Sequence, residues 1–352
     1  GCSLDHEEQR EMESKTVLVT GGAGFIGSHL IISLKEKYPD WKIINLDNLD
    51  YCSSLQNLVI TELGNNYRFI EGDICDQHFI KHLFATENID IVFHFAAQTH
   101  VEDSFLFPSR FMAVNAEGTR VLLSAALNSG VERFIFVSTD EVYGASSDEA
   151  FDESCLKRPT NPYAVSKATA ENIVMSFWEN HNLPIIITRS NNIYGPRQHY
   201  EKVNHHYIKH FTIQGSGLQS RHFLFVEDVT DAFLTVMEQG VLGEIYNIGT
   251  DFEIPVIKLA RELVRMMKQP SDGELDDWLL FVKDRPHNDL RYPISSEKLL
   301  KLGWKPKVSW REGIRRTIQW YEDNPDVWPS SQSFQSTLQN SSQTSGLKVK
   351  TL

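Results

Sequence analysis

The sequence predicts an α/β fold: a Rossmann-type, doubly wound parallel sheet followed by a smaller, discontinuous C-terminal lobe. Short apolar runs alternate with helical patterns over the first 195 residues, which is typical of strand–helix units with helices on both faces of a sheet. A glycine-rich turn follows the first run, and beyond residue 196 the pattern becomes shorter and less regular. The predicted strands lie near residues 16–20, 42–47, 67–71, 90–96, 132–138 and 184–190.

The turn after the first strand has the spacing of a dinucleotide-binding site. Gly21, Gly24 and Gly27 lead directly into an apolar helix pattern. Such glycines give a tight turn and close backbone approach to a pyrophosphate. The first N–H groups of the helix, at Phe25 and Ile26, are then expected to face the phosphates. The strand–turn–helix context makes this motif more specific than glycines alone.

Asp47 ends the second predicted strand, twenty residues after Gly27. A carboxylate there accepts hydrogen bonds from the adenosine ribose and repels a 2′-phosphate, so we expect NAD rather than NADP. The alternative is an ordinary turn residue. The third strand leads to Asp73 and Ile74, which we expect near the adenine.

The fourth strand ends in small residues, Ala96 and Ala97, which leave room for a cofactor. Small residues are also common in ordinary cores, so this observation is weak alone. His94 lies within the same apolar run and is interpreted as a core histidine rather than a ligand.

A predicted helix carries a tyrosine and a lysine on one face. Asn161-Pro162 opens it, Tyr163 follows, and Lys167 comes four residues later. Residues at this spacing share a helix face, so the lysine charge is expected to lower the pKa of the phenol and make it a base. Alone, the same spacing is common on surface helices.

The fifth strand ends in a cluster of hydroxyl and carboxyl groups, namely Ser138, Thr139, Asp140 and Glu141. Such a cluster is often a solvated turn or a helix cap. Beside a tyrosine–lysine pair, however, two carboxyl groups suggest more proton transfers than a simple alcohol oxidation needs. We therefore interpret the cluster as catalytic.

Taken together, the motifs resemble the extended short-chain dehydrogenase/reductase family of nucleotide-sugar enzymes, and within it the dTDP-glucose 4,6-dehydratases. The resemblance runs from about residue 15 to about residue 328. Most of its motifs mark the extended family generally, whereas the Thr139-Asp140-Glu141 triplet indicates the dehydratase branch. The motifs occupy residues 20–28, 72–76, 100–104, 115–119, 138–144, 163–167, 190–196, 225–229, 246–249, 284–286 and 302–306.

This resemblance implies a lyase that converts dTDP- or UDP-glucose into the 4-keto-6-deoxy sugar, with NAD reduced and reoxidised in one cycle. Tyr163, next to Lys167, would take the proton of the 4-hydroxyl, which Thr139 hydrogen-bonds. Glu141 would remove the C5 hydrogen, and Asp140 would protonate the 6-hydroxyl that leaves as water. Hydride removed from C4 would return to C6.

The resemblance also implies further binding residues. Asn115 and Ser138 are expected at the cofactor, together with Tyr163 and Lys167. Arginine suits bidentate phosphate contact, although a solvated surface arginine is the alternative at each position. The expected substrate-binding residues are Thr139, Asn192, Lys202, Arg221, Asn247 and Arg285.

The chain departs from the family pattern in two places. Residues 203–212 are shortened relative to the family pattern near the expected nucleotide base, which leaves open a looser base pocket, a splice-like defect or an inactive enzyme. Asn288 stands where bacterial relatives often have histidine. The adjacent His205 and His206 cannot converge on one ion by themselves, so no metal site is predicted.

Three alternative functions stay open. A nucleotide-sugar 4-epimerase needs only the tyrosine–lysine pair, and a UDP-glucuronate decarboxylase typically keeps the glutamate without the aspartate. Asp140 argues against both. The third alternative is an NAD-binding protein without turnover, which only the shortened 203–212 segment supports.

Composition limits the partners. The net charge is −13 without a basic stripe, which argues against nucleic acid and anionic membranes. The four cysteines lack metal-binding spacing and indicate free thiols in a reducing compartment, so we expect a cytoplasmic protein. No run of spanning length and no signal-peptide pattern is found.

The expected organisation has two interleaved domains between disordered tails at 1–14 and 329–352. The NAD-binding domain comprises 15–195 plus 228–250, and the nucleotide-sugar-binding lobe comprises 196–227 plus 251–328.

Two predicted helices, 108–128 and 162–180, suggest a homodimer. The first has more apolar surface than a helix between sheet and water needs, and relatives of this fold commonly dimerise through a four-helix bundle. Val121 and Met175 were the expected interface positions. The alternative is a helix covered by a loop of its own chain.

Overall fold

The computed structural model describes residues 14–58, 64–145, 149–199, 211–268, 270–271, 273–284, 289–325 and 327. Its centre is a seven-stranded sheet in which all neighbouring strands are parallel, in the order β3-β2-β1-β4-β5-β6-β10. The predicted fold class is therefore confirmed. The strands are β1 Thr16–Thr20, β2 Lys42–Asp47, β3 Tyr67–Glu71, β4 Ile91–His94, β5 Arg133–Thr139, β6 Ile185–Ser190 and β10 Ile245–Ile248.

The strands form where the chain is apolar on both faces, because a parallel sheet covered on both sides buries every side chain. In β1, Val17 and Val19 face one side and Leu18 faces the other, and all three are fully buried. Three of the six predicted strands have the expected bounds, and the others differ by one or two residues. The seventh strand, β10, lies within the 228–250 segment that we expected to return to this domain.

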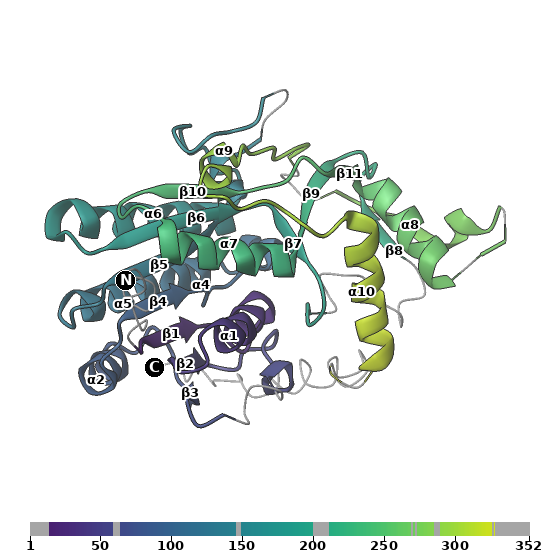
Figure 1. Cartoon of the computed structure of the whole chain (residues 1–352). Helices are drawn as coiled ribbons and strands as arrows, with labels where there is room; N and C mark the ends of the chain where they lie inside the picture. The colour runs from purple at the N-terminus through teal and green to yellow at the C-terminus, as the bar shows by residue number, and fades with distance from the viewer. Residues whose placement is uncertain are drawn as a thin grey trace, which may run out of the picture.

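Helices cover both faces of the sheet (Figure 1). On one face lie α1 (Phe25–Lys37) and α7 (Val226–Gln239), whose apolar side chains join the same core cluster. On the other face lie α2 (Gln77–Glu87), α5 (Thr119–Leu127) and α6 (Pro162–His181). The sheet and these helices form three layers.

A smaller lobe lies to one side of the large sheet (Figure 1). It has its own core cluster, which includes Tyr194, Phe225 and Ile314. The exact domain boundaries stay a prediction. The lobe contains β7 Asn192–Tyr194, β8 Phe211–Gln214, β9 Ser220–Phe225, β11 Glu253–Pro255, β12 Leu279–Val282, α8 Val256–Lys268, η5 Leu275–Trp278 and α10 Trp310–Asp323.

The predicted helix at 108–128 is not a uniform α-helix. It begins as α4 (Pro108–Phe111), continues as a π-helix, η2 (Met112–Gly118), and ends as α5. π-Helical turns are rare in proteins, and those that occur are frequently found at functional sites. The remaining short helices are η1 Leu55–Leu58, α3 Val101–Leu106, η3 Asp140–Tyr143 and α9 Glu297–Leu300.

His94 is a core residue, as predicted. Its Nδ1 lies 2.7 Å from Thr20 Oγ1 and its Nε2 lies 2.9 Å from Thr119 Oγ1. Burial, followed by the charge of Lys167, lowers the pKa of His94 to about 3. The neutral ring therefore links β1, β4 and α5 inside the core.

Within the part of the chain that the structure describes, no helix has both the length and the apolar composition that crossing a membrane requires. In the described part of the chain, Cys52, Cys75 and Cys155 form no disulfide. Cys2 and the predicted tails, apart from Ser14, lie outside the described residues.

Candidate active site

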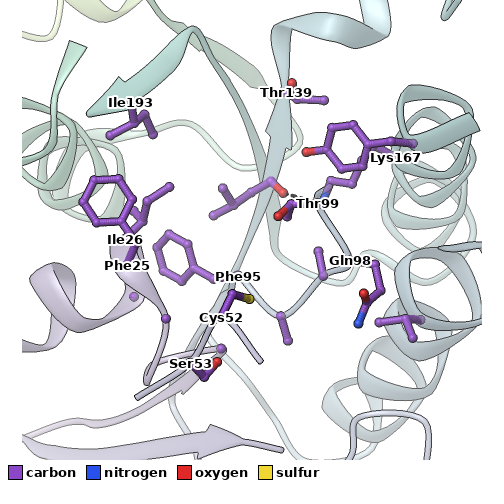
Figure 2. Close-up of a pocket in the computed structure, with 18 of the residues that line it drawn as sticks. Phe25, Ile26, Cys52, Ser53, Phe95, Gln98, Thr99, Thr139, Lys167 and Ile193 are labelled. Carbon is purple, nitrogen blue, oxygen red and sulfur yellow. Dashed lines mark hydrogen bonds between the residues drawn. The ribbon is translucent and has the colours of Figure 1, made fainter. Parts of the chain in front are cut away.

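A cavity of about 440 Å³ opens at the carboxyl ends of the parallel strands. It crosses the point between β1 and β4 where the strand order changes direction, which is the usual ligand position in such sheets. Figure 2 shows Cys52 and Ser53 at one end of this cavity and Thr139 and Lys167 at the other. The cavity therefore connects the predicted cofactor site with the predicted catalytic residues.

The glycine turn is built so that backbone atoms face the cavity. Gly21 has φ +71°, and a Cβ there would lie 2.7 Å from Ala96 N. A Cβ on Gly27 would lie 2.4 Å from Gly21 O, so neither position accepts a side chain. Gly24 begins α1 without a side-chain cap, and Gly24, Phe25 and Ile26 line the cavity. This uncapped helix N-terminus fits a pyrophosphate.

Asp47, at the end of β2, lines the cavity and is hydrogen-bonded to the backbone of the glycine turn. Its carboxylate accepts hydrogen bonds from Ala23 N at 3.0 Å, Leu49 N at 2.8 Å and Ser53 Oγ at 3.3 Å. Burial is the largest effect on this group and raises the pKa of Asp47. The arrangement fits a ribose diol at the cavity wall, as the sequence predicts.

The remaining predicted cofactor residues divide into two groups. Asp73, Ile74, Ala96 and Ala97 line the cavity. Asn115, in η2, lies behind the wall instead. Its amide donates to Gln98 O at 2.9 Å and to Ser166 Oγ at 2.9 Å, and its Oδ1 accepts from Gln98 N at 2.8 Å. It thus shapes the loop after β4.

The loops after β2 and β4 are joined beside the cavity. Asp50 Oδ2 accepts hydrogen bonds from Gln98 Nε2 at 2.8 Å and from Arg110 Nη2 at 2.8 Å. Both Asp50 and Gln98 line the cavity. Neither residue stands out in the sequence, because the pairing of Asp50 with Gln98 spans 48 positions.

The five predicted catalytic residues converge at the other end of the cavity. Thr139 ends β5, Asp140 and Glu141 begin η3, and Tyr163 and Lys167 lie in the first turns of α6. Ser138 lines the same wall. The structure therefore brings together side chains that the sequence separates by 28 positions or fewer.

Asp140 has the environment of an acid that keeps its proton near neutral pH. Burial, followed by the charge of Glu141, raises its pKa from 3.8 to about 7. Hydrogen bonds from Asn191 Nδ2 at 2.8 Å and Thr139 Oγ1 at 3.3 Å act in the opposite direction. A protonated Asp140 can serve as an acid in the same cycle in which a second carboxyl group serves as a base.

The prediction that Lys167 lowers the pKa of Tyr163 is wrong. The Lys167 ammonium donates to Val137 O at 2.7 Å and lies 4.4 Å from the centre of the Phe136 ring. Burial, followed by the charges of Glu141 and Asp140, raises the pKa of Tyr163 rather than lowering it. Reasoning from helical spacing missed both burial and the two carboxylates.

Glu171 lies one turn after Lys167 on α6 and interacts with it electrostatically. Burial lowers the pKa of Lys167 to about 8, and the charge of Glu171 opposes this shift. Glu171, fully buried, accepts two hydrogen bonds from Arg189 on β6, at 3.0 and 2.6 Å. The buried ion pair connects the catalytic helix to the sheet.

The predicted substrate residues do not all reach the cavity. Thr139, Asn192 and Arg221 line it. Asn247 is fully buried elsewhere: its Oδ1 accepts from Tyr143 Oη at 2.8 Å and its Nδ2 donates to Phe151 O at 3.1 Å. The family motif thus marks a packing residue at this position. Lys202 and Arg285, like the shortened segment 203–212, Asn288 and the His205-His206 pair, lie wholly or largely outside the described residues.

Arg221 is held at the cavity wall by its neighbours. Its Nη1 donates to Ser220 O at 2.8 Å and Asp289 O at 2.9 Å, and its guanidinium lies 5.0 Å from the centre of the Tyr292 ring. Tyr292 also lines the cavity and donates to Asp289 Oδ2 at 2.6 Å. No sequence motif identified Tyr292.

Two asparagines contact the carboxyl pair directly. Asn191 donates to Asp140, as described above, and Asn161 Nδ2 donates to Glu141 Oε2 at 2.7 Å. Asn161 opens the predicted tyrosine–lysine helix, and Asn191 belongs to the motif at residues 190–196. The spacing of these motifs gives no sign of the two contacts. Among the described residues, no three His, Cys, Asp or Glu side chains are grouped as metal ligands.

The glycine turn, Asp47 and the tyrosine–lysine helix on this sheet define a dinucleotide-binding enzyme of the short-chain dehydrogenase/reductase type. The family model described as GDP-mannose 4,6 dehydratase matches residues 18–317. The chain belongs to this family of nucleotide-sugar 4,6-dehydratases.

Individual relatives agree with this assignment. The chain is 57% identical over 322 residues to a dTDP-D-glucose 4,6-dehydratase of Homo sapiens, covering 90% of this chain and 92% of the relative. It is 43% identical to a trifunctional UDP-glucose 4,6-dehydratase of Arabidopsis thaliana, covering 89% of this chain and 48% of the relative. A dTDP-glucose 4,6-dehydratase of Streptomyces venezuelae, solved with NAD bound, superposes with TM-score 0.83 at 34% identity, covering 89% and 98%.

Proposed function

We propose that the protein is a lyase that dehydrates a nucleoside-diphosphate glucose to the 4-keto-6-deoxy sugar. The observation that carries this conclusion is the meeting of Asp140 and Glu141 with Tyr163 and Lys167 in the cavity that the glycine turn opens. An oxidation at C4 needs only the tyrosine and lysine. The two carboxyl groups supply the proton transfers of a dehydration.

The residues act in sequence around one sugar ring. Tyr163 takes the proton of the 4-hydroxyl, and Thr139 hydrogen-bonds the same oxygen. The 4-ketone makes the C5 hydrogen acidic, and Glu141 removes it. Asp140, whose raised pKa of about 7 keeps much of it protonated, gives its proton to the 6-hydroxyl, which leaves as water. Lys167 holds a positive charge next to the reacting groups.

The cofactor is NAD, which when bound accepts the C4 hydride and returns it to C6, so the cycle has no net redox change. The uncapped start of α1, Gly21 and Asp47 are the residues that would hold it. Solved members of this fold with NAD bound support this cofactor.

The nucleotide-sugar substrate places its pyrophosphate near a cation. Arg221 is suited to this contact because backbone carbonyls orient its planar guanidinium at the cavity wall. Relatives named for dTDP-glucose and for UDP-glucose are both similar to this chain. The base of the nucleotide is therefore open, and both substrates belong in the assay.

Incubating the purified protein with NAD and either dTDP-glucose or UDP-glucose tests this function. We expect a 4-keto-6-deoxy sugar, identified by NMR, and no product from a Tyr163→Phe control. Formation of the 4-epimer without a deoxy sugar would instead identify an epimerase. Retention of NAD without turnover of either sugar would identify a non-catalytic binding protein.

A homodimer is the expected assembly. Phe107 and Val165 are 57% and 43% exposed on the packed surface of α3, α4 and α6, which is unusual for side chains of this size. Val121, an interface position expected from the sequence, is only 4% exposed within the core, so that choice is wrong. Light scattering of a Phe107→Asp, Val165→Asp double variant should show a monomer, whereas Leu218→Asp, at another exposed apolar site, should not.

We also propose that the protein works in the cytoplasm. Among the described residues, Cys52, Cys75 and Cys155 form no disulfide, which fits a reducing compartment. Cell fractionation tests this location.

A further inference from the structure

Asn161 makes two contacts that serve different parts of the site. It is the N-cap residue of α6, where its Oδ1 accepts a hydrogen bond from Ala164 N at 2.8 Å. Its Nδ2 donates to Glu141 Oε2 at 2.7 Å. Asn161 is 4% exposed, its contact with Ala164 is buried, and its contact with Glu141 is partly buried at the cavity. One amide therefore joins the catalytic helix to a catalytic carboxylate.

The contacts fix the orientation of this amide. The backbone N–H of Ala164 can only donate, so it must face the amide oxygen. The amide nitrogen must then face Glu141, and it can donate only to an oxygen that accepts. The reversed amide would set its oxygen against the carboxylate and lose the helix cap. The Asn161 amide is thus oriented to donate to Glu141.

We propose that Asn161 is a positioning residue that orients the Glu141 carboxyl group towards C5 of the sugar and ties it to the same helix that presents Tyr163. The proposal rests on the proposed function. Hydrogen bonds to a charged carboxylate are stronger than neutral ones and fix its direction. Asn161 itself touches neither the sugar nor the cofactor in this role.

The neighbours of Glu141 explain why such a donor is needed. Among the described residues, Asp140 on η3, Tyr163 on α6 and Tyr292 in the segment before α9 are titratable groups that interact electrostatically with it. None of the three carries a positive charge, and each would oppose a charged Glu141 on losing its own proton. Arg221 acts on Asp140 and Tyr292. The Asn161 amide supplies a hydrogen-bond donor directly to Glu141 Oε2.

Two substitutions separate the donor from the helix cap. Asn161→Ser keeps a favoured N-cap residue but lacks the amide donor. Asn161→Asp has nearly the same shape, keeps the cap, and places a carboxyl group at hydrogen-bonding distance from Glu141. Two carboxyl groups at that distance do not easily ionise together, so the pKa of one of them is raised. Both variants are expected to fold, because Ser and Asp are good N-caps.

The experiment measures exchange of the C5 hydrogen in D2O with the 4-keto-6-deoxy product, which isolates the step of Glu141 from the first oxidation. We expect Asn161→Ser to slow exchange by about tenfold, less than the roughly 10²- to 10⁴-fold that a general base itself contributes, because Glu141 remains. Asn161→Asp should move the acid limb of the pH profile to higher pH. Formation of reduced cofactor from the glucose substrate should change less than exchange in both variants.

An unchanged pH profile in Asn161→Asp together with parent exchange rates in Asn161→Ser would overturn the proposal. So would equal losses of oxidation and exchange, because they would mark Asn161 as a helix cap alone. If the parent protein binds NAD but exchanges no C5 hydrogen, the proposed function fails as well. If the parent exchanges this hydrogen and the variants behave as in the outcomes above, only the role of Asn161 fails.

Discussion

Replacing Asp140 by asparagine should stop the reaction after the first hydride transfer. Asparagine has the same shape, and its Oδ1 can accept the hydrogen bond that Asn191 now donates to the aspartate. The variant cannot deliver a proton to the 6-hydroxyl. Tyr163 can still take the proton of the 4-hydroxyl, so oxidation at C4 should continue.

The size of the effect follows from the role and the pKa of this group. A positioned general acid contributes roughly 10²- to 10⁴-fold, which corresponds to about 3–5 kcal/mol of activation free energy. Since the pKa of Asp140 is raised to about 7, the parent has about half of this acid protonated at pH 7 and about a tenth at pH 8. Water loss by the parent should therefore slow about tenfold per pH unit above this value.

Stopped-flow absorbance of the reduced nicotinamide is the assay. In the parent the signal should be transient, and in Asp140→Asn it should accumulate to a stable level with the oxidation rate little changed. The decrease in rate above about pH 7 should also be absent from the pH profile of the variant's residual activity. Turnover of the variant at the parent rate would refute the assignment, and a parent rate that is flat to about pH 9 would refute the pKa argument.

Three other outcomes are expected. Asp47→Ala should narrow the preference for NAD over NADP in equilibrium binding, because the carboxylate that repels a 2′-phosphate is gone; equal affinities in the parent would contradict this. Arg189→Met should lower the free energy of unfolding in urea by about 3–5 kcal/mol, since Glu171 loses its bidentate partner and keeps, among the described residues, the ion pair with Lys157 at 3.3 Å. For Asp140, the folded pKa is raised, so its contribution to stability is present below about pH 4 and lost as pH rises to about 7. Asp140→Asn should consequently gain stability relative to the parent between these values, by up to about 4 kcal/mol, and a constant difference would refute it.

The sheet and the glycine turn could be predicted because their signals are local. A strand covered on both faces is a continuous apolar run, and Gly21 and Gly27 occur where a Cβ would meet the backbone. The order of the motifs along the chain then places the site at the strand ends. The grouping of the five predicted catalytic residues in one cavity was predictable for the same reason, since each of them belongs to a short motif.

The helix at 108–128 shows where periodicity fails. Each residue of an α-helix advances by about 100°, and a π-helical segment bonds one residue further along, so faces counted across it shift. Residues 112–118 form such a segment, and the position counted as exposed at Val121 is instead in the core. No composition rule marks this π-helix.

The partners of the catalytic side chains were also beyond sequence reasoning. Asn191 and the carbonyl of Tyr292 meet across 101 positions, and Asn161 reaches Glu141 across 20. An amide that donates to a carboxylate looks the same in a sequence as one that caps a turn. The raised pKa of Tyr163 was missed because burial depends on the packed structure rather than on the next helical turn.

The joint between β1 and β4 has a consequence for handling the protein. These strands pair over four residues and connect the half of the sheet formed by β1–β3 with the half formed by β4, β5, β6 and β10. The cavity bridges this joint, so a dinucleotide in it would touch both halves. Binding to the folded state alone adds stability that grows with the logarithm of ligand concentration. Loss of NAD during purification would thus weaken the join between the halves, and amide hydrogen exchange at β1 and β4 would report it first.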